Sequence, residues 1–304
     1  MSASFPIPQL LSVSASHRHA ALQVIDCARR GKCCALLGPR LSGTTEVLQA
    51  VQAELAQDSL CACIYIDLKE IKVSSQSEFF ASLARVTLGR ARKYLGEQEL
   101  GTNIFPIDSG ADFRRFLKEC ALRIKRDLVL IIDHLHNAPN DLILALLTSL
   151  RAAYMDQEPG GPVVVAVVCG ALSLAALTIG QTSPFANVAE AVFVNVLSDT
   201  ESAALIQEHT AWASVRLSTG AEAALLRATR GDPRLIERIC RSCLQTTGQG
   251  AFRQVTARTV NRAVRKFIEE QASSYEPFVE ALSLIEDSPD LLRCILLLLE
   301  QGTV

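Results

Sequence analysis

Aromatic residues and net charge are both scarce in this 304-residue sequence. Aromatic side chains make up 5% of the chain, and 30 basic against 32 acidic residues leave a formal net charge of −2. This balance argues against a protein that coats nucleic acid over its whole surface, although it permits a local basic patch. Because 49% of the residues are hydrophobic, the chain is able to form a packed core, which excludes general disorder. Its length suggests two domains of ~100–200 residues each.

Disulfide, zinc-binding and secretory patterns are absent as well. The ten cysteines lie scattered inside apolar runs, which is typical of reduced thiols in cytoplasmic proteins. Cys240 and Cys243 form one pair with no second pair at zinc spacing, so we interpret both as core residues rather than metal ligands. The first 16 residues lack the basic start and apolar run of a secretory signal. We therefore expect a cytoplasmic protein.

One uncharged stretch approaches the length of a membrane-spanning helix. No charged residue occurs between Glu158 and Glu190, and residues 163–180 reach the threshold of ~18 residues for a span. However, Val163–Val168 is β-branched, follows two glycines and two prolines, and stops at Gly170. This pattern favours a buried strand followed by a short helix, so we expect no membrane segment.

Five short apolar runs recur along the first two thirds of the chain, each followed by turn residues and a helical pattern. These runs are Cys33–Leu37, Cys61–Leu68, Leu128–Asp133, Val163–Cys169 and Ala191–Leu197. Continuous apolar runs are typical of parallel strands that helices cover on both faces. Capping boxes predict helix starts at three pairs: Ser75 with Glu78, Ser198 with Glu201, and Thr219 with Glu222. The pattern predicts an α/β fold with a five-stranded parallel sheet between helices.

The strand signal stops after Leu197, and only helical patterns follow. We predict an N-terminal extension at 1–17, an α/β domain at 18–197, an all-α lid domain at 198–270 and the start of a C-terminal unit at 271–304. The last helical run, Leu291–Glu300, is apolar nearly all round. We expect either that the chain is truncated or that this helix packs on another molecule.

The first predicted strand leads into a loop with the spacing of a phosphate-binding P-loop, GxxxxGK[ST], except at one position. The loop reads Gly38-Pro39-Arg40-Leu41-Ser42-Gly43-Thr44-Thr45. Its two glycines allow successive backbone N–H groups to face an anion, and the following helix adds the partial positive charge of its N-terminus. Thr45 is a candidate Mg²⁺ ligand. Thr44, however, replaces the lysine whose ammonium neutralises phosphates, and Arg40 is a candidate substitute for it.

A partner acid and a missing cation complete the chemical pattern. Asp133 ends a predicted strand and is the candidate for holding Mg²⁺ through water. In hydrolysing relatives a glutamate follows, whereas here His134 follows, with a different reach and pKa. We interpret His134 and His136 as polar loop residues, and His134 remains the one candidate catalytic residue. Ring-forming ATPases with such a loop place an arginine finger, worth roughly 10³–10⁵ in rate, just after the fourth strand. In this sequence that place falls between Arg151 and Arg216, where there is no lysine or arginine.

Five segments, taken in order, resemble the AAA-like modules of STAND signalling ATPases. They are Ala21–Leu55 around the loop, Ile64–Leu68, Leu128–Asp133, Thr182–Phe185, and Thr229–Pro233 followed by Leu235 and Cys240. The resemblance covers about residues 18–300 and includes Val264–Ile285, which in the family leads into a winged-helix unit. It implies the fold, ATP or ADP with Mg²⁺ as the ligand, and a role in signalling or defence assemblies.

The resemblance also implies site residues. Gly231 and Pro233 correspond to the turn that packs beside the adenine, although the same turn is also explained as a plain connection between two helices. They join the loop residues Gly38, Pro39, Arg40, Ser42, Gly43, Thr44 and Thr45 as nucleotide-binding candidates, with Thr45 and Asp133 for Mg²⁺. The departures from the family lie at Thr44 and His134. The chain therefore resembles an inactive member.

One segment of the chain is strongly basic, although the net charge of the whole chain is close to zero. Between Arg227 and Lys266 there are ten lysines and arginines against two acids. Arg234, Arg238 and Arg241 share one helix face, and Arg258, Arg262 and Arg265 repeat the spacing. Three interpretations of this segment remain open: a solvated face, a site for nucleotide phosphate or an acidic partner, and a site for a nucleic-acid backbone. The scarcity of aromatics implies that nucleic-acid binding would be phosphate-led and salt-sensitive.

These observations lead to one principal hypothesis and two alternatives. The principal hypothesis is a degenerate AAA/STAND-like nucleotide-binding module that hydrolyses ATP weakly or not at all and acts as a regulatory switch or scaffold. It would work with a protein partner, with further domains or as a homo-oligomer. The first alternative is an active ATPase that uses Arg40 and His134. The second is a DNA-associated AAA+ regulator that binds through Arg258, Arg262 and Arg265.

Overall fold

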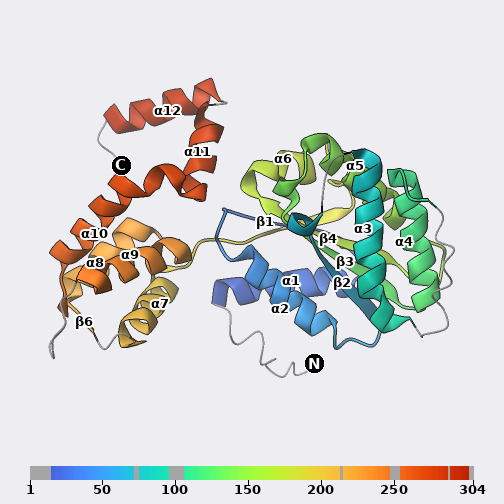
Figure 1. Ribbon diagram of the computed structural model, residues 1–304, viewed down its shortest axis with the longest axis horizontal. Helices are drawn as coiled ribbons and strands as arrows, with labels where there is room; N and C mark the ends of the chain where they lie inside the picture. The colour runs from blue at the N-terminus through green and yellow to red at the C-terminus, as the bar shows by residue number, and fades with distance from the viewer. Residues whose placement is uncertain are drawn as a thin grey trace. The chain divides into compact units, whose positions relative to one another are not determined.

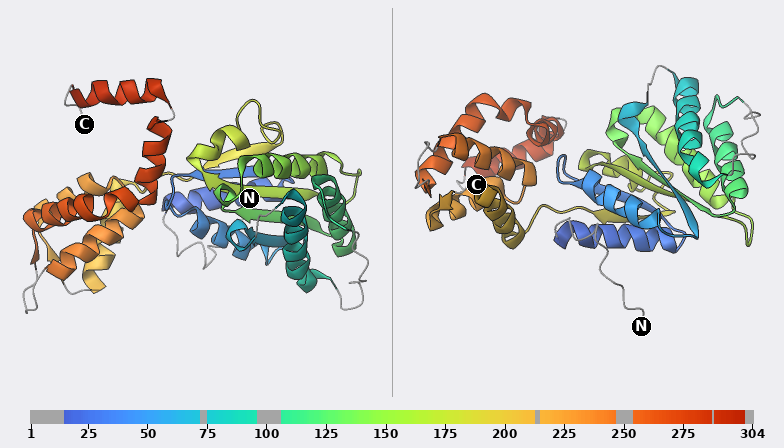
Figure 2. Two further views of the ribbon diagram at one scale, coloured as in Figure 1. Left: turned by 45° about the horizontal axis from the view of Figure 1, so that its top comes forward. Right: turned by 60° about the horizontal axis from the view of Figure 1, so that its bottom comes forward.

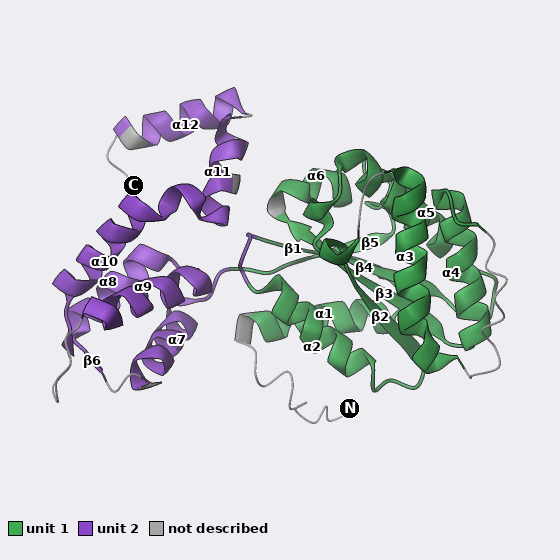
Figure 3. Ribbon diagram, viewed as in Figure 1, with its two compact units in different colours: residues 1–38, 43–195 green, residues 39–42, 196–304 purple. Residues whose placement is uncertain are grey.

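A computed structural model describes residues 15–71, 75–95, 106–212, 215–246, 254–286 and 288–300. The chain forms two compact units (Figures 1 and 3). The first unit contains residues 1–38 and 43–195, and the second contains residues 39–42 and 196–304. The short segment 39–42 thus belongs to the second unit. The bounds of the four segments expected from the sequence remain predictions.

The first unit is built on a five-stranded sheet in the order β2-β3-β4-β1-β5, and every neighbouring pair is parallel. The strands are β1 (Cys33–Gly38), β2 (Cys61–Asp67), β3 (Asp127–Asp133), β4 (Val164–Ala171) and β5 (Ala189–Phe193). All five predicted strands are present, which confirms the α/β fold. Strand β5 covers Ala189–Phe193 rather than the predicted Ala191–Leu197. Its partner β1 ends where the loop begins, so the last paired residues are Leu37 and Phe193.

Helices cover both faces of this sheet (Figure 2). Helices α1 (Ala15–Arg29) and α2 (Thr44–Leu55) pack on the face that contains Cys34 and Leu36. Helices α3 (Gln76–Ala91), α4 (Gly110–Ile124) and α5 (Asn140–Met155) cover the face that contains Cys33 and Ala35. Because successive strand side chains point to opposite faces, the inner strands β1 and β4 are buried along their whole length.

The uncharged stretch at 163–180 forms β4, a 3₁₀ turn (Leu172–Leu174) and the short helix α6 (Ala175–Thr178), as predicted. Within the described residues, no helix has the length and apolarity needed to cross a membrane.

Two of the three predicted caps are present. The hydroxyl of Ser75 accepts a hydrogen bond from the N–H of Glu78. Ser198 and Glu201 form the reciprocal pair of a capping box. The third prediction, at Thr219, is wrong: the N-cap is Ser218, whose hydroxyl accepts from the Ala221 N–H at 3.2 Å. Thr219 is the first residue of the helix instead. The preceding serine has the extended backbone that an N-cap requires.

The second unit consists mainly of helices. They are α7 (Asp199–Trp212), α8 (Thr219–Thr229), α9 (Pro233–Thr246), α10 (Ala257–Glu270), α11 (Glu276–Glu286) and α12 (Pro289–Glu300). The sequence predicted helices alone after Leu197, but two-residue strands β6 (Arg216–Leu217) and β7 (Gln254–Val255) pair in parallel. Cys240 and Cys243 lie in the core, each 2% exposed.

Candidate phosphate-binding site

The P-loop joins β1 to α2 and has the backbone conformation that its glycine pattern predicts. Gly43 is the N-cap of α2 and adopts a left-handed conformation at φ +91°. A Cβ at this position would lie 2.4 Å from Cε1 of His17, a buried ring on α1. Both the positive φ and the close approach therefore require glycine. The α2 N-terminus offers backbone N–H groups at this point, as phosphate binding requires.

Asp133 lies at the carboxyl end of β3 and is only 2% exposed. Its Oδ2 accepts hydrogen bonds from the hydroxyls of Thr45 at 3.0 Å and Tyr65 at 2.8 Å. Its Oδ1 accepts from the backbone N–H of His134 at 2.7 Å. These donors satisfy a buried carboxylate. The two Mg²⁺ candidates, Thr45 and Asp133, are thus in direct contact.

His134 follows Asp133 in a left-handed conformation at φ +57°. Its Nδ1 lies 2.9 Å from Oδ1 of Asp67 and 3.4 Å from Oδ2 of Asp133. Asp67 ends β2, and the register places it beside Asp133 on β3. A carboxylate can only accept, so this contact has the Nδ1–H of His134 donate to Asp67. The histidine is therefore oriented by Asp67 rather than placed at random in a loop.

Thr44, in the lysine position, lies beside Cys169 of β4, whose thiol is buried at 1% exposure. Thr44 and Asp133 both influence the protonation of this thiol. Burial, reinforced by the negative charge of Asp133, raises the pKa of the Cys169 thiol far above its usual value. A hydroxyl and a neutral thiol thus occupy the region where a lysine-bearing loop carries positive charge. Within the described residues, none of the hydrogen bonds or ion pairs of Thr45, Asp67 and Asp133 involves a lysine or arginine side chain.

Arg40, the candidate substitute for the lysine, forms an ion pair with Glu276 at the start of α11, with Nη1 3.1 Å from Oε2. The neighbouring Leu41 has a left-handed backbone at φ +64° and packs against the core of the second unit. Ser42 is 3% exposed, and its hydroxyl has no hydrogen-bond partner among the described residues. The structure thus places the Arg40 guanidinium on an acid of the helical unit.

Gly231 and Pro233 lie at the start of α9 in the second unit. Gly231 adopts φ +82°, and a Cβ there would lie 2.1 Å from the carbonyl oxygen of Leu197. The Leu197 N–H donates to the Gly231 carbonyl at 2.9 Å. Asp232 caps the helix by accepting from the Leu235 N–H at 2.9 Å. These contacts explain the turn structurally, and its contact with adenine remains a prediction.

The oxygen atoms at the P-loop fit a magnesium ion. Hard divalent cations prefer carboxylate and hydroxyl oxygens, and the Thr45 hydroxyl and the Asp133 carboxylate already lie together. A bound Mg²⁺ would supply the positive charge that Thr44 does not. No group of three or more His, Cys, Asp or Glu side chains among the described residues is arranged to hold another metal ion.

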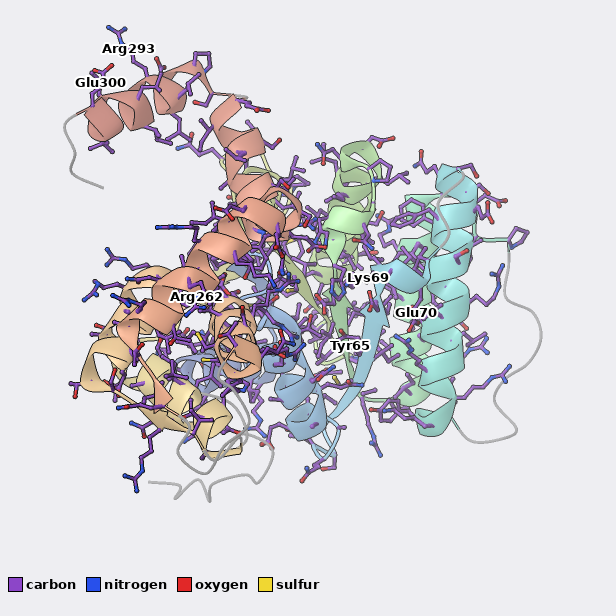
Figure 4. All side chains as sticks on the ribbon, turned by 60° about the vertical axis from the view of Figure 1, so that its left-hand side comes forward. Tyr65, Lys69, Glu70, Arg262, Arg293 and Glu300 are labelled. Carbon is purple, nitrogen blue, oxygen red and sulfur yellow. The ribbon has the colours of Figure 1, made fainter. Side chains whose placement is uncertain are left out.

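Sequence reasoning missed Tyr65, Asp67 and Cys169, which surround the predicted residues. All three lie toward the carboxyl ends of β2 and β4. In parallel sheets ligands bind at this edge. An acid at the end of the predicted strand Ile64–Leu68 therefore indicated Asp67 as a site residue. Figure 4 shows Tyr65 on its strand. No spacing rule predicts that the Tyr65 hydroxyl contacts Asp133, because that contact depends on the register of β2 against β3.

No protein-family model matches the sequence, and no curated protein is significantly similar to it. Solved structures do share the fold. The Walker-type ATPase of Pyrococcus abyssi has a TM-score of 0.62 at 15% identity, over 90% of this chain and 76% of that chain. Cdc6p from Pyrobaculum aerophilum has a TM-score of 0.55 at 14% identity, over 87% and 69%.

The ORC1 protein of Aeropyrum pernix, whose structure was solved in complex with DNA, has a TM-score of 0.51 at 16% identity, over 87% of this chain and 70% of that chain. At these identities the likeness shows the fold alone. The chain thus shares the α/β fold, with its helical second unit, of these Walker-type ATPase, Cdc6p and ORC1 structures.

Proposed function

We propose that this protein is a nucleotide-binding module that holds ATP or ADP with Mg²⁺ and turns it over slowly or not at all. One observation carries the proposal: Thr44, a neutral side chain beside the buried Cys169, occupies the lysine position of the P-loop and presents no cation to the phosphates. The loop retains the glycine conformation and the helix N-terminus that bind phosphate. It lacks the ammonium that stabilises charge during phosphoryl transfer.

Two further features support binding without efficient hydrolysis. The position of the usual catalytic glutamate holds His134, an imidazole in place of a carboxylate. In addition, the segment between Arg151 and Arg216 has no lysine or arginine, so it offers no arginine finger. Such a module is suited to report nucleotide occupancy to a protein partner or to another copy, as a regulatory switch or scaffold. The resemblance to STAND modules supports a role in signalling or defence.

A second candidate function rests on the orientation of His134. An imidazole positioned by Asp67 resembles the histidine–carboxylate pairs that handle protons in enzymes. ATP hydrolysis with His134 in the glutamate position is therefore the alternative. It predicts that His134→Ala abolishes turnover while it preserves nucleotide affinity.

The decisive experiment measures binding and turnover on the same purified protein. A fluorescent ATP analogue with Mg²⁺ gives the dissociation constant, and phosphate release gives the rate. We expect saturable binding that is lost in Thr45→Ala and Asp133→Ala and kept in Thr148→Ala, a matched change on the exposed face of α5. Turnover near 1 s⁻¹ or faster, on the order of ordinary enzymes, would overturn the proposal.

A further inference from the structure

A basic groove lies between helices α9 and α10 of the second unit. It encloses about 550 Å³. Its charged lining consists of four cations and two acids: Arg234, Arg238, Arg241, Lys266, Glu237 and Glu270. Ser242, Gln245 and Gln271 add hydroxyl and amide groups. The groove therefore combines a net positive charge with neutral hydrogen-bond donors.

The helical period explains why these cations line one side. Arg234, Arg238 and Arg241 follow at i, i+4 and i+7, so they lie along one face of α9 over about 10.5 Å of helix axis. The opposite face is apolar and packs into the core of the unit, where Ile236 and Cys243 are buried. Rotation of α9 would expose that core, so the arginines are fixed at the groove.

Ion pairs hold three of the four groove cations in place, among them Lys266, which lies 3.9 Å from Glu270. Four cations against two acids still leave the lining net positive. Glu237 pairs with Arg234 at 3.3 Å and with Arg241 at 2.6 Å. Arg238 donates to Gln271 at 3.3 Å and lies over the Tyr275 ring, 5.3 Å from its centroid. The side chains of Arg234 and Arg241 remain 52% and 68% exposed. Ion pairs this exposed contribute about 0–1 kcal/mol, so a stronger anion readily displaces them.

The exposed face of α10 continues the positive charge beyond the groove. Lys266 lines the groove, and Arg262 precedes it by one helical turn on an exposed position (Figure 4). Arg258 and Arg265 lie on the same helix. An extended anion with regularly spaced charges fits two helices of cations better than a single phosphate group does.

We infer that this groove binds the phosphodiester backbone of nucleic acid, with Arg238, Arg241 and Lys266 as the principal contacts. Arginine, lysine, serine and glutamine are the side chains that contact phosphate oxygens. Interfaces with proteins have centres rich in aromatic residues and poor in charge, whereas the groove lining is charged and its aromatic ring, Phe267, is 5% exposed. Phosphate contacts carry no sequence information, so this binding is independent of base sequence.

The test measures fluorescence anisotropy of a labelled duplex of roughly 30 base pairs over a salt series, in EDTA and without nucleotide. These conditions separate the inference from the proposed nucleotide binding. Removal of one protein–phosphate contact should make the slope of log K against log salt shallower by about 0.9. The variant Arg238→Gln/Arg241→Gln/Lys266→Gln should therefore reduce the slope by about 2.7 and lower affinity at least about tenfold.

Two controls make the outcome specific. Arg85→Gln/Arg115→Gln/Arg126→Gln removes the same charge from exposed positions of the first unit and should change the slope much less. Arg241→Gln/Lys266→Gln leaves the Arg238 contact with Tyr275 intact, and a slope change of about 1.8 is expected without a decrease in helix content by circular dichroism. Absence of wild-type binding at low salt, equal effects of groove and control variants, or tighter binding of a polyglutamate peptide than of the duplex would each overturn the inference.

Discussion

The Thr45 hydroxyl donates directly to Oδ2 of Asp133 across 3.0 Å, which joins the start of α2 to the carboxyl end of β3. Tyr65 donates to the same oxygen from β2. The carboxylate is thus shared by two hydroxyls, and within the described part of the chain no lysine or arginine side chain bonds to it. A metal ion bound here would replace the hydrogen bond between Thr45 and Asp133, and the oxygen atoms of these two residues would hold it.

The first prediction concerns the dependence of nucleotide binding on Mg²⁺. Asp133 is buried, Thr44 is neutral and Arg40 is paired with Glu276. A polyphosphate brought to this loop without metal therefore meets negative charge that no cation at the lysine position offsets. We therefore expect ATP binding to vanish in EDTA. Thr44→Lys should restore binding in EDTA, since a hydrogen bond to a charged group contributes about 1.5–3 kcal/mol, or roughly ten- to hundredfold in affinity.

Isothermal titration calorimetry with and without EDTA checks this expectation. Thr44→Val is the matched control, because it removes the hydroxyl, adds no charge and should leave binding in EDTA undetectable. Wild-type binding that is equally tight with and without metal would contradict the charge argument even if nucleotide binding itself is confirmed.

The second prediction concerns Tyr65, whose hydroxyl donates a hydrogen bond to the buried carboxylate of Asp133. Tyr65→Phe should lower the free energy of unfolding by about 1.5–3 kcal/mol, the range for a hydrogen bond to a charged group. Tyr94→Phe provides the comparison, because its hydroxyl makes two neutral bonds to the backbone of Cys63, at 3.0 and 3.2 Å. At about 0.5–1.5 kcal/mol for each bond, we expect a loss of about 1–3 kcal/mol there. Urea denaturation gives both values, and a loss at Tyr65 below about 1 kcal/mol would contradict the assignment.

Much of the fold and part of the site could be predicted from sequence, and the difference has a physical origin. The strands were visible because parallel strands buried on both faces require continuous apolar runs. The loop was visible because phosphate binding needs glycine at a position such as Gly43. The roles of Tyr65 and Asp67 could not be predicted, because they depend on the register of β2 against β3. The cap prediction at Thr219 was wrong because Ser218 offers the same hydroxyl one residue earlier.

The third prediction concerns alkaline pH. Burial raises the pKa of the Cys63 and Cys120 thiols to about 12. A thiol with a raised pKa contributes stability that is complete below the pKa of the unfolded chain and is lost as the pH rises toward the folded value. We therefore expect the free energy of unfolding to fall above about pH 9.

Each buried thiol adds at most about 1.4 kcal/mol per pH unit to this fall. Cys120→Ala should make the slope of stability against pH between about 9.5 and 11 shallower by up to that amount, whatever its cost at neutral pH. Cys294→Ala, a change at the exposed cysteine, is the control and should leave the slope as in wild type. Urea unfolding across this range decides, and identical slopes for the two variants would refute the prediction.

The fourth prediction separates two roles of Gly231. Gly231→Ala imposes a side chain at φ +82° and places a Cβ 2.1 Å from the Leu197 carbonyl oxygen, so it should destabilise the protein by at least about 2 kcal/mol. Gly89→Ala is the matched control, since its Cβ would meet nothing within 4 Å inside α3 and should stabilise by about 0.5–1 kcal/mol. Thermal and urea unfolding measure both changes. If Gly231→Ala instead leaves stability unchanged and weakens nucleotide binding alone, the turn serves the adenine and its packing against Leu197 is secondary.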